Sequence, residues 1–170
     1  MINKNSLLNL LDEYNIKYIL YEHPPLFSVE DSKKLRGDIE GAHTKNLFLK
    51  NKKNNFFLFT CLESSKVDLK ILKNKLELGN ISFAGEKYLI ELLNLKPGSV
   101  SPFGLLNDRD KKIQFFIDAA LDNYETFNFH PLINTATINI SKNDFYNFFK
   151  INKININLIN FRNYDTRTIK

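Results

Sequence analysis

Few side chains in this sequence have the type and setting for chemistry, and Lys45, Asn46 and His130 are the strongest candidates. Lys45 carries a compact positive charge that suits a phosphate group. The amide of Asn46 could orient a bound molecule through hydrogen bonds. His130 is of the residue type that gains or loses a proton near neutral pH. Lys45 also has the plain interpretation of a solvated lysine, and His130 that of a structural histidine.

Lys45 and Asn46 are adjacent, at the beginning of a predicted strand over residues 46–50. Successive side chains of a strand point to opposite faces of a sheet. The two residues can therefore share one site only if the strand begins after them or contains a bulge.

A second candidate region is the stretch Pro-Gly-Ser-Val-Ser-Pro-Phe-Gly at residues 97–104, which is too rich in proline and glycine for a regular element. Gly98 would let the backbone approach a ligand closely, because glycine has no Cβ atom. The same composition is also typical of a plain connecting turn, and the glycine and proline content alone favours that interpretation.

Several catalytic signatures are missing from the sequence. It contains no G-x-x-x-x-G-K-[ST] phosphate-binding loop and no G-x-S-x-G nucleophile elbow. The three histidines, His23, His43 and His130, and the single Cys61 do not have the spacing of a zinc site, so we expect no metal and no other cofactor. Cys61 lies in an apolar pattern, which favours a small buried hydrophobic residue over a nucleophile.

Length and composition are those of one globular domain. The chain has 170 residues, of which 43% are hydrophobic, and a net charge of +5 that would favour a polyanionic partner without identifying it. We expect no signal peptide, and no stretch approaches the roughly 20 apolar residues of a membrane helix. A single cysteine suits a reducing compartment, so we expect a cytoplasmic protein that does not contact a membrane.

The elements that must position the candidate residues follow from the hydrophobic pattern. Helices are predicted at residues 5–15, 29–35, after Asp68, at 86–93, and after Ser141, which resembles a capping box with Asp144. Strands are predicted at 17–21, 46–50, 56–61, 113–117, 126–129 and 135–140, with a hairpin turn at 51–55. This mixed order favours an α+β domain. Residues after Phe161 are predicted to form a polar, mobile tail.

Four segments resemble the YbaK/prolyl-tRNA-synthetase-associated editing domain family, in the family's order and nearly its spacing. They are Tyr21-Glu22-His23-Pro24-Pro25, the segment from Gly41 to Lys50, the segment from Pro97 to Leu105, and the segment from Phe129 to Thr137. The resemblance implies a single α+β domain with a mixed, barrel-like sheet flanked by helices. It places an aminoacyl-tRNA editing domain at residues 1–161 and the tail at 162–170.

The resemblance also implies roles for particular residues. Lys45 would contact a phosphate near the terminal adenosine, and His130 the aminoacyl group or the attacking water. The 97–104 stretch would line the amino-acid pocket and supply backbone N–H groups to an oxyanion, with Val100 and Phe103 as candidate walls. Ser101 stands where threonine is more usual in the family. The substrate-binding residues implied in this way are Asn46, Gly98, Ser99, Val100, Ser101, Phe103, Gly104 and Asn134.

The activity that the resemblance implies is hydrolysis of alanine wrongly attached to tRNA(Pro), by the free-standing branch of the family. The expected partner is the acceptor end of tRNA(Pro), and the protein is expected to be a monomer; association with a prolyl-tRNA synthetase stays open. Two alternatives stay open as well. One is a deacylase of cysteinyl-tRNA(Pro), of the YbaK branch, and the other is a non-catalytic module that binds an aminoacyl-tRNA or an amino acid.

Overall fold

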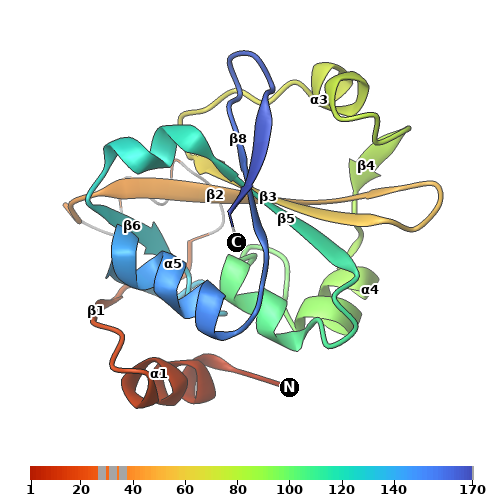
Figure 1. Ribbon diagram of the computed structural model, residues 1–170. Coiled ribbons are helices and arrows are strands. Elements are labelled where there is room, and N and C mark those ends of the chain that lie inside the picture. The colour runs from red at the N-terminus through yellow and green to blue at the C-terminus, as the bar shows by residue number, and fades with distance from the viewer. Residues whose placement is uncertain (27–29, 31–33, 35–37, 170) are drawn as a thin grey trace.

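Figure 1 shows the fold, taken from a computed structural model that describes residues 1–26, 30, 34 and 38–169. The predicted helix at 29–35 lies almost wholly outside these residues. The helices are α1 (Lys4–Glu13), α3 (Leu69–Lys75), α4 (Glu86–Tyr88), the π-helical turn η1 (Leu89–Leu93), the 3₁₀ helices η2 (Pro102–Asn107) and η3 (Ala119–Asn123), and α5 (Lys142–Ile151). In the described part of the chain, none of them has the length and apolar character needed to cross a membrane.

The strands form one mixed sheet, in the order β1-β7-β6-β2-β3-β5-β8-β9, with β4 paired to β2 beside this path. They are β1 (Tyr18–Glu22), β2 (Ala42–Asn51), β3 (Phe56–Leu62), β4 (Ile81–Phe83), β5 (Ile113–Asp118), β6 (Thr126–Phe129), β7 (Ala136–Ser141), β8 (Ile156–Ile159) and β9 (Thr166–Ile169). The α+β prediction is confirmed. The barrel-like description is corrected, because the end strands β1 and β9 do not pair with each other among the described residues and the sheet is open.

The predicted hairpin of residues 46–61 is the longest feature of the sheet and crosses the middle of the molecule (Figure 1). Side chains of β3 alternate between two hydrophobic clusters: Phe56 and Leu58 belong to the larger one, and Phe57 and Phe59 to the smaller one. Both faces of this part of the sheet are therefore buried, which explains the continuous apolar run in the sequence.

Helices cover the two faces unequally. The larger cluster contains buried residues of α1, η1, η2 and α5, whereas the smaller one contains Leu72 of α3. In Figure 1, α3 accordingly lies above the hairpin, and α1 and α5 lie below it. The periodic leucines and phenylalanines that predicted these helices are the residues that they bury.

Polar side chains fix where three of the helices begin. Asp68 accepts hydrogen bonds from the backbone N–H groups of Lys70 and Ile71 at the start of α3, and Ser141 accepts one from Asp144 at the start of α5. At α1, Asn3 and Ser6 form a reciprocal capping box. The cap at Ser141 and a helix beginning after Asp68 were expected from the sequence, whereas the box at Asn3 was not.

The structure corrects two predictions of irregular chain. The stretch rich in proline and glycine contains η2, in which Pro102 occupies the first turn, where its missing N–H is tolerated. Residues 166–169 form β9, which pairs with β8 in antiparallel register, so the predicted tail is wrong for this segment. The sequence Thr-Arg-Thr-Ile of β9 has no alternating apolar pattern that would predict a strand. The strand forms by pairing with β8, and its side chains are mostly exposed.

Phe103→Ala is expected to lower the free energy of unfolding by about 3–5 kcal/mol, since the substitution leaves a cavity in a packed core. Phe103 is fully buried and its ring contacts those of Phe129, Phe148 and Phe149. The matched control is Phe83→Ala, because Phe83 on β4 is 61% exposed. Urea unfolding of both variants measures the difference, and equal losses would contradict this assignment of the core.

Candidate functional site

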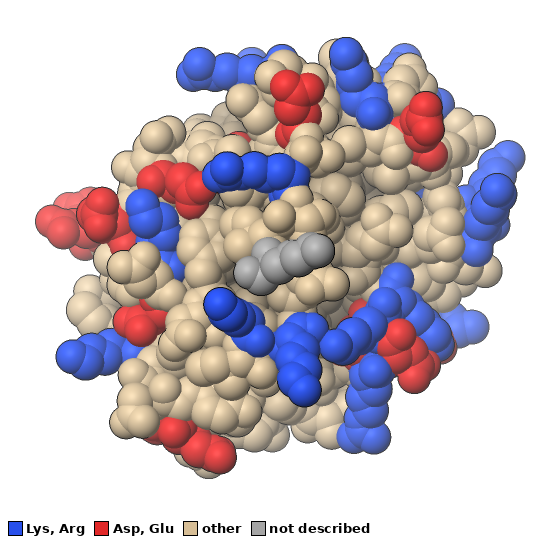
Figure 2. Space-filling model, viewed as in Figure 1, with Lys and Arg blue, Asp and Glu red and all other residues tan. Residues whose placement is uncertain are grey.

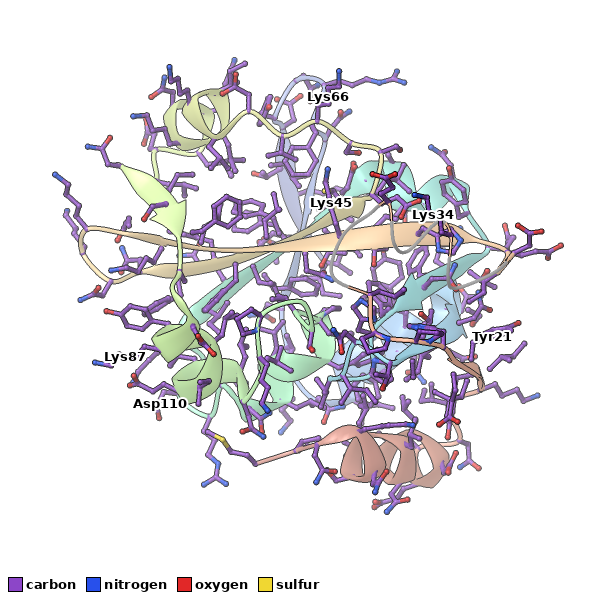
Figure 3. The ribbon with its side chains drawn as sticks, turned by 180° about the vertical axis from the view of Figure 1, so that it is seen from behind. Tyr21, Lys34, Lys45, Lys66, Lys87 and Asp110 are labelled. Atoms are coloured by element: carbon purple, nitrogen blue, oxygen red, sulfur yellow. The ribbon has the colours of Figure 1, made fainter. Side chains whose placement is uncertain are left out.

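Lys45 and Asn46 lie within β2, on opposite faces of the sheet. The register with β3 is continuous across them, with Lys45 opposite Cys61 and Asn46 opposite Thr60, so no bulge occurs in this part of the pair. In Figure 3 the side chain of Lys45 leaves β2 on the side of α3. The structure therefore does not bring the two side chains together, and the condition for a shared site is not met.

The ammonium group of Lys45 is held by the main chain. Its Nζ atom donates a hydrogen bond to the carbonyl oxygen of Ser65, in the segment after β3. The hydroxyl of Ser65 in turn donates to the carboxylate of Asp118 at 3.3 Å. Lys45 is thus half-buried and partnered, rather than an extended solvated lysine.

Both polar atoms of the Asn46 side-chain amide make hydrogen bonds. Nδ2 donates to the carbonyl oxygen of Val100 at 2.9 Å, and Oδ1 accepts from the hydroxyl of Thr60 at 2.5 Å. Thr60 is completely buried, so this bond is shielded from water. Asn46 therefore ties β2 to residues 97–101, which we name the 97–101 loop.

Asn46 and His130 meet at a small polar cavity of about 30 Å³. Its lining residues are Leu26, His43, Thr44, Asn46, Asn128, Phe129, His130 and Thr137. A volume of this order holds a water molecule or a methyl group. Neither Lys45 nor any residue of 97–104 is in this lining.

The ring of His130 is positioned by the strand that follows it. Its Nδ1 atom lies 3.1 Å from the carbonyl oxygen of Ala136, the first residue of β7. His23 and His43 also have partners: His23 Nε2 lies 2.9 Å from the hydroxyl oxygen of Thr137, and His43 Nε2 lies 2.7 Å from the carbonyl oxygen of Ile39. Of these two, His43 also lines the cavity.

The 97–101 loop begins with a tight turn. Ser99 donates its backbone N–H to the carbonyl oxygen of Lys96 at 3.1 Å, and Gly98 has a φ of 82°. Proline followed by glycine with positive φ is the pattern of a type II turn, which only glycine adopts without strain. The turn explains Gly98 locally, and the contact of Val100 with Asn46 connects the loop to the candidate site.

Residues 102–104 belong to η2, and they are buried together with Ser101. Ser101 caps η2 by accepting from the backbone N–H of Phe103. A Cβ atom on Gly104 would come within 2.9 Å of a terminal methyl group of Leu95, so Gly104 is closely packed and a larger residue would displace that side chain. Phe103 faces the core, which corrects its interpretation as a wall of the amino-acid pocket.

Asn134 supports the cavity indirectly. Its Nδ2 atom donates to the carbonyl oxygen of Leu26 at 3.3 Å, and its own carbonyl oxygen accepts from the backbone N–H of Leu26. Leu26 lines the cavity, so Asn134 fixes one part of its wall. Thr44, Asn128 and Thr60 are polar residues of the site that the sequence did not single out, because ordinary strand residues of these types carry no distinguishing pattern.

The face of the sheet that carries Lys45 has buried ionisable groups. Burial raises the pKa of Asp118, although hydrogen bonds from the backbone N–H of Ala120 and from Ser65 act in the opposite direction. Burial also raises the pKa of the Cys61 thiol to about 12, against the favourable charge of Lys45. The neutral thiol agrees with a structural Cys61.

Three further observations limit the extent of the site. Within the described ranges, no group of three His, Cys, Asp or Glu side chains could hold a metal ion. A larger cavity of about 490 Å³ lies between the end of η2, β5 and β8, but none of the candidate residues lines it. On the face drawn in Figure 2, basic side chains are spread among acidic ones rather than gathered over one element.

Comparison with known proteins identifies the class to which this fold and site belong. The sequence profile of the aminoacyl-tRNA editing domain matches residues 23–148, which include the β2 segment, the 97–101 loop and His130. The chain belongs to the aminoacyl-tRNA editing domain family, and its activity class is that of an aminoacyl-tRNA deacylase.

Individual relatives agree with this membership. The prolyl-tRNA synthetase associated domain-containing protein 1 of Xenopus laevis is 38% identical over 152 residues, covering 86% of this chain and 90% of the relative. The prolyl-tRNA editing protein ProX of Acetoanaerobium sticklandii is 36% identical, covering 88% and 92%. A crystal structure provisionally described as a trans-editing enzyme for prolyl-tRNA synthetase superposes with a TM-score of 0.64 at 16% identity, covering 92% and 96%, which shows the common fold.

The thiol of Cys61 should be unreactive in the folded protein. Because its pKa is raised to about 12, the folded state keeps its proton at pH values at which the unfolded thiol, with an ordinary pKa, loses it. Stability from this group is therefore complete below about pH 8.5 and falls as pH rises toward 12. Reaction with a disulfide reagent at pH 8 should require unfolding, and between pH 8.5 and 10 wild type should lose about 1–2 kcal/mol more stability than Cys61→Ala. Rapid modification of native Cys61 would contradict its burial.

Proposed function

We propose that this protein hydrolyses alanyl-tRNA(Pro), releasing alanine and the intact tRNA. The observation that carries the choice of alanine is the small polar cavity lined by Asn46 and His130, whose volume of about 30 Å³ is of the order of a methyl group. The names of the relatives support tRNA(Pro), since the ProX protein of Acetoanaerobium sticklandii is a prolyl-tRNA editing protein. The partner is then the acceptor end of tRNA(Pro), on which the protein acts as a monomer.

The reaction needs little from the protein. An aminoacyl ester is already activated, so hydrolysis requires a held 3′ end, a placed water molecule and donors for the developing oxyanion. The water attacks the ester carbonyl carbon, the bond from that carbon to the ribose oxygen breaks, and the ribose oxygen takes a proton. No covalent enzyme intermediate is part of this scheme.

His130 is the group proposed to orient the water. If Nδ1 donates its proton to the Ala136 carbonyl oxygen, the neutral ring presents Nε2 as an acceptor. In this tautomer the ring accepts rather than donates at Nε2, which is the role that the proposed contact with water needs. Direct proton abstraction by His130 is not required, because the free ribose hydroxyl can position the water as well.

Lys45 is proposed to bind a phosphate near the terminal adenosine, outside the cavity. Its place on the opposite face from Asn46 excludes contact of both side chains with the same atom of the ester. Its present partner is a neutral carbonyl oxygen, which a phosphate oxygen can replace with a stronger, charge-assisted bond.

Size discrimination is the primary test of this function. Alanyl-tRNA(Pro) should be cleaved rapidly and prolyl-tRNA(Pro) at least about tenfold more slowly, because a ring that does not fit loses a few kcal/mol of binding in the transition state. Deacylation of alanyl-, cysteinyl-, seryl- and prolyl-tRNA(Pro) by the purified protein measures this. Equal rates on alanyl- and prolyl-tRNA(Pro) would refute editing, and a preference for cysteinyl-tRNA(Pro) would assign the protein to the other substrate.

Lys45→Ala should lower kcat/KM for alanyl-tRNA(Pro) by about ten- to hundredfold, since a charged hydrogen bond is worth about 1.5–3 kcal/mol. The control is Lys52→Ala, which removes an exposed lysine from the turn between β2 and β3. Both variants should unfold cooperatively in urea, which separates a loss of activity from a loss of fold. A folded Lys45→Ala protein with wild-type kcat/KM would remove Lys45 from the site.

A further inference from the structure

One side of β2 lacks a neighbouring strand at its middle. β6 pairs with β2 only at Ala42 and His43, and β4 pairs with it only at Leu49–Asn51. Among the described residues, no strand lies beside residues 44–47 on the side away from β3. We name this segment the open edge.

The main chain of Asn46 faces the open edge. The carbonyl oxygen of His43 points toward β3, because it accepts from the backbone N–H of Glu63 at 2.8 Å, whereas that of Phe48 points away from β3 and accepts from Ala84 at 2.9 Å. Backbone groups of successive strand residues alternate between the two sides. The N–H and C=O of Asn46, two residues before Phe48, therefore point away from β3. Outside the strand pairs, no backbone hydrogen bond between described residues ends on Asn46.

Neighbouring segments surround the open edge, because side chains on β2 hold them against it. The amide of Asn46 holds the Val100 carbonyl, which brings the 97–101 loop against β2. The hydroxyl of Thr44 donates to the carbonyl oxygen of Asn128 at 2.7 Å, at the point where β6 leaves β2. The small cavity with His130 in its wall adjoins the same residues, Thr44 and Asn46.

We propose that the aminoacyl group of the substrate pairs with the main chain of Asn46 as if it were one residue of an antiparallel strand. The N–H of Asn46 donates to the ester carbonyl oxygen, and the C=O of Asn46 accepts from the α-ammonium group. An amino-acid residue opposite another in such a pair exchanges these two bonds. The proposal rests on the proposed function, since it describes how the site at Asn46 binds an aminoacyl ester.

This pairing accounts for both chemistry and selectivity. The donated N–H stabilises the negative charge that develops on the carbonyl oxygen when water attacks. Residues opposite each other in an antiparallel pair place their side chains on the same face, so the methyl group of alanine lies on the face of the Asn46 side chain and the cavity. Proline carries a ring carbon on the nitrogen that must approach the Asn46 carbonyl.

Each side-chain polar atom of Asn46 makes one hydrogen bond, Nδ2 to Val100 and Oδ1 from Thr60. The side chain thus positions the 97–101 loop, while the main chain offers the substrate a donor and an acceptor side by side. Recognition through an unpaired strand edge is a general way for a sheet to bind a peptide-like group.

Amide hydrogen exchange measured by NMR tests the donor half of the proposal. The probe is 3′-deoxy-3′-(alanylamino)adenosine, which the enzyme cannot hydrolyse as an ester, at concentrations that inhibit deacylation. Exchange of the Asn46 amide should slow by about tenfold on binding. The amides of Lys45 and Leu47 face β3 and serve as internal controls that should not change. Inhibition by the analogue without slower exchange of the Asn46 amide would overturn the proposal. The proposed contacts involve only the aminoacyl group, so an active enzyme that the analogue does not inhibit would overturn it as well.

A change in the substrate tests the acceptor half. Propionyl-tRNA(Pro) keeps the methyl group and the ester but lacks the α-ammonium group, so its kcat/KM should be at least about tenfold below that of alanyl-tRNA(Pro). Equal values would overturn the pairing with the Asn46 carbonyl. If the protein cleaves neither substrate nor any other aminoacyl-tRNA, the proposed function itself is refuted. This outcome is distinct from equal rates on the two substrates, which refute only the pairing.

Discussion

The double pairing of β2 is the constraint on which the rest of the structure depends. β2 pairs continuously with β3 on one side. On its other side it pairs with β6 at one end and with β4 at the other. β6 pairs only as far as His43 and β4 only from Leu49, so an unpaired segment lies between these two partners. In this protein the segment contains Asn46, and the cavity, the 97–101 loop and His130 all adjoin it.

Burial of both faces of β3 fixes the register of the β2–β3 pair. Phe57 and Phe59 on one face and Phe56 and Leu58 on the other fix the register of β3, because a slip by one residue would exchange the two clusters. The register of β2 follows from that of β3 through their continuous pairing. The position of Asn46 is therefore set by hydrophobic side chains that take no part in the proposed chemistry.

The same pairing separates two candidate residues that are adjacent in the sequence. Lys45 lies with Ser65, Cys61 and Asp118 on one face, while Asn46 lies with Thr60 and Val100 on the other. A phosphate contact and an ester site on the two faces of one strand can be connected by a flexible single-stranded 3′ end. Such an arrangement would let the protein hold the nucleic acid without placing a cation in the small cavity.

The sequence by itself determined the class of fold, the positions of most helices and strands, and the family, because hydrophobic periodicity and the four motifs are local properties of the chain. It also showed that Lys45 and Asn46 could not share a face of a regular strand. Only the tertiary structure decided that the strand is regular, that Phe103 and Gly104 belong to the core, and that residues 166–169 pair with β8. The open edge at Asn46 was likewise beyond the sequence. It results from where β6 and β4 end beside β2, and such endings depend on contacts between residues far apart in the chain.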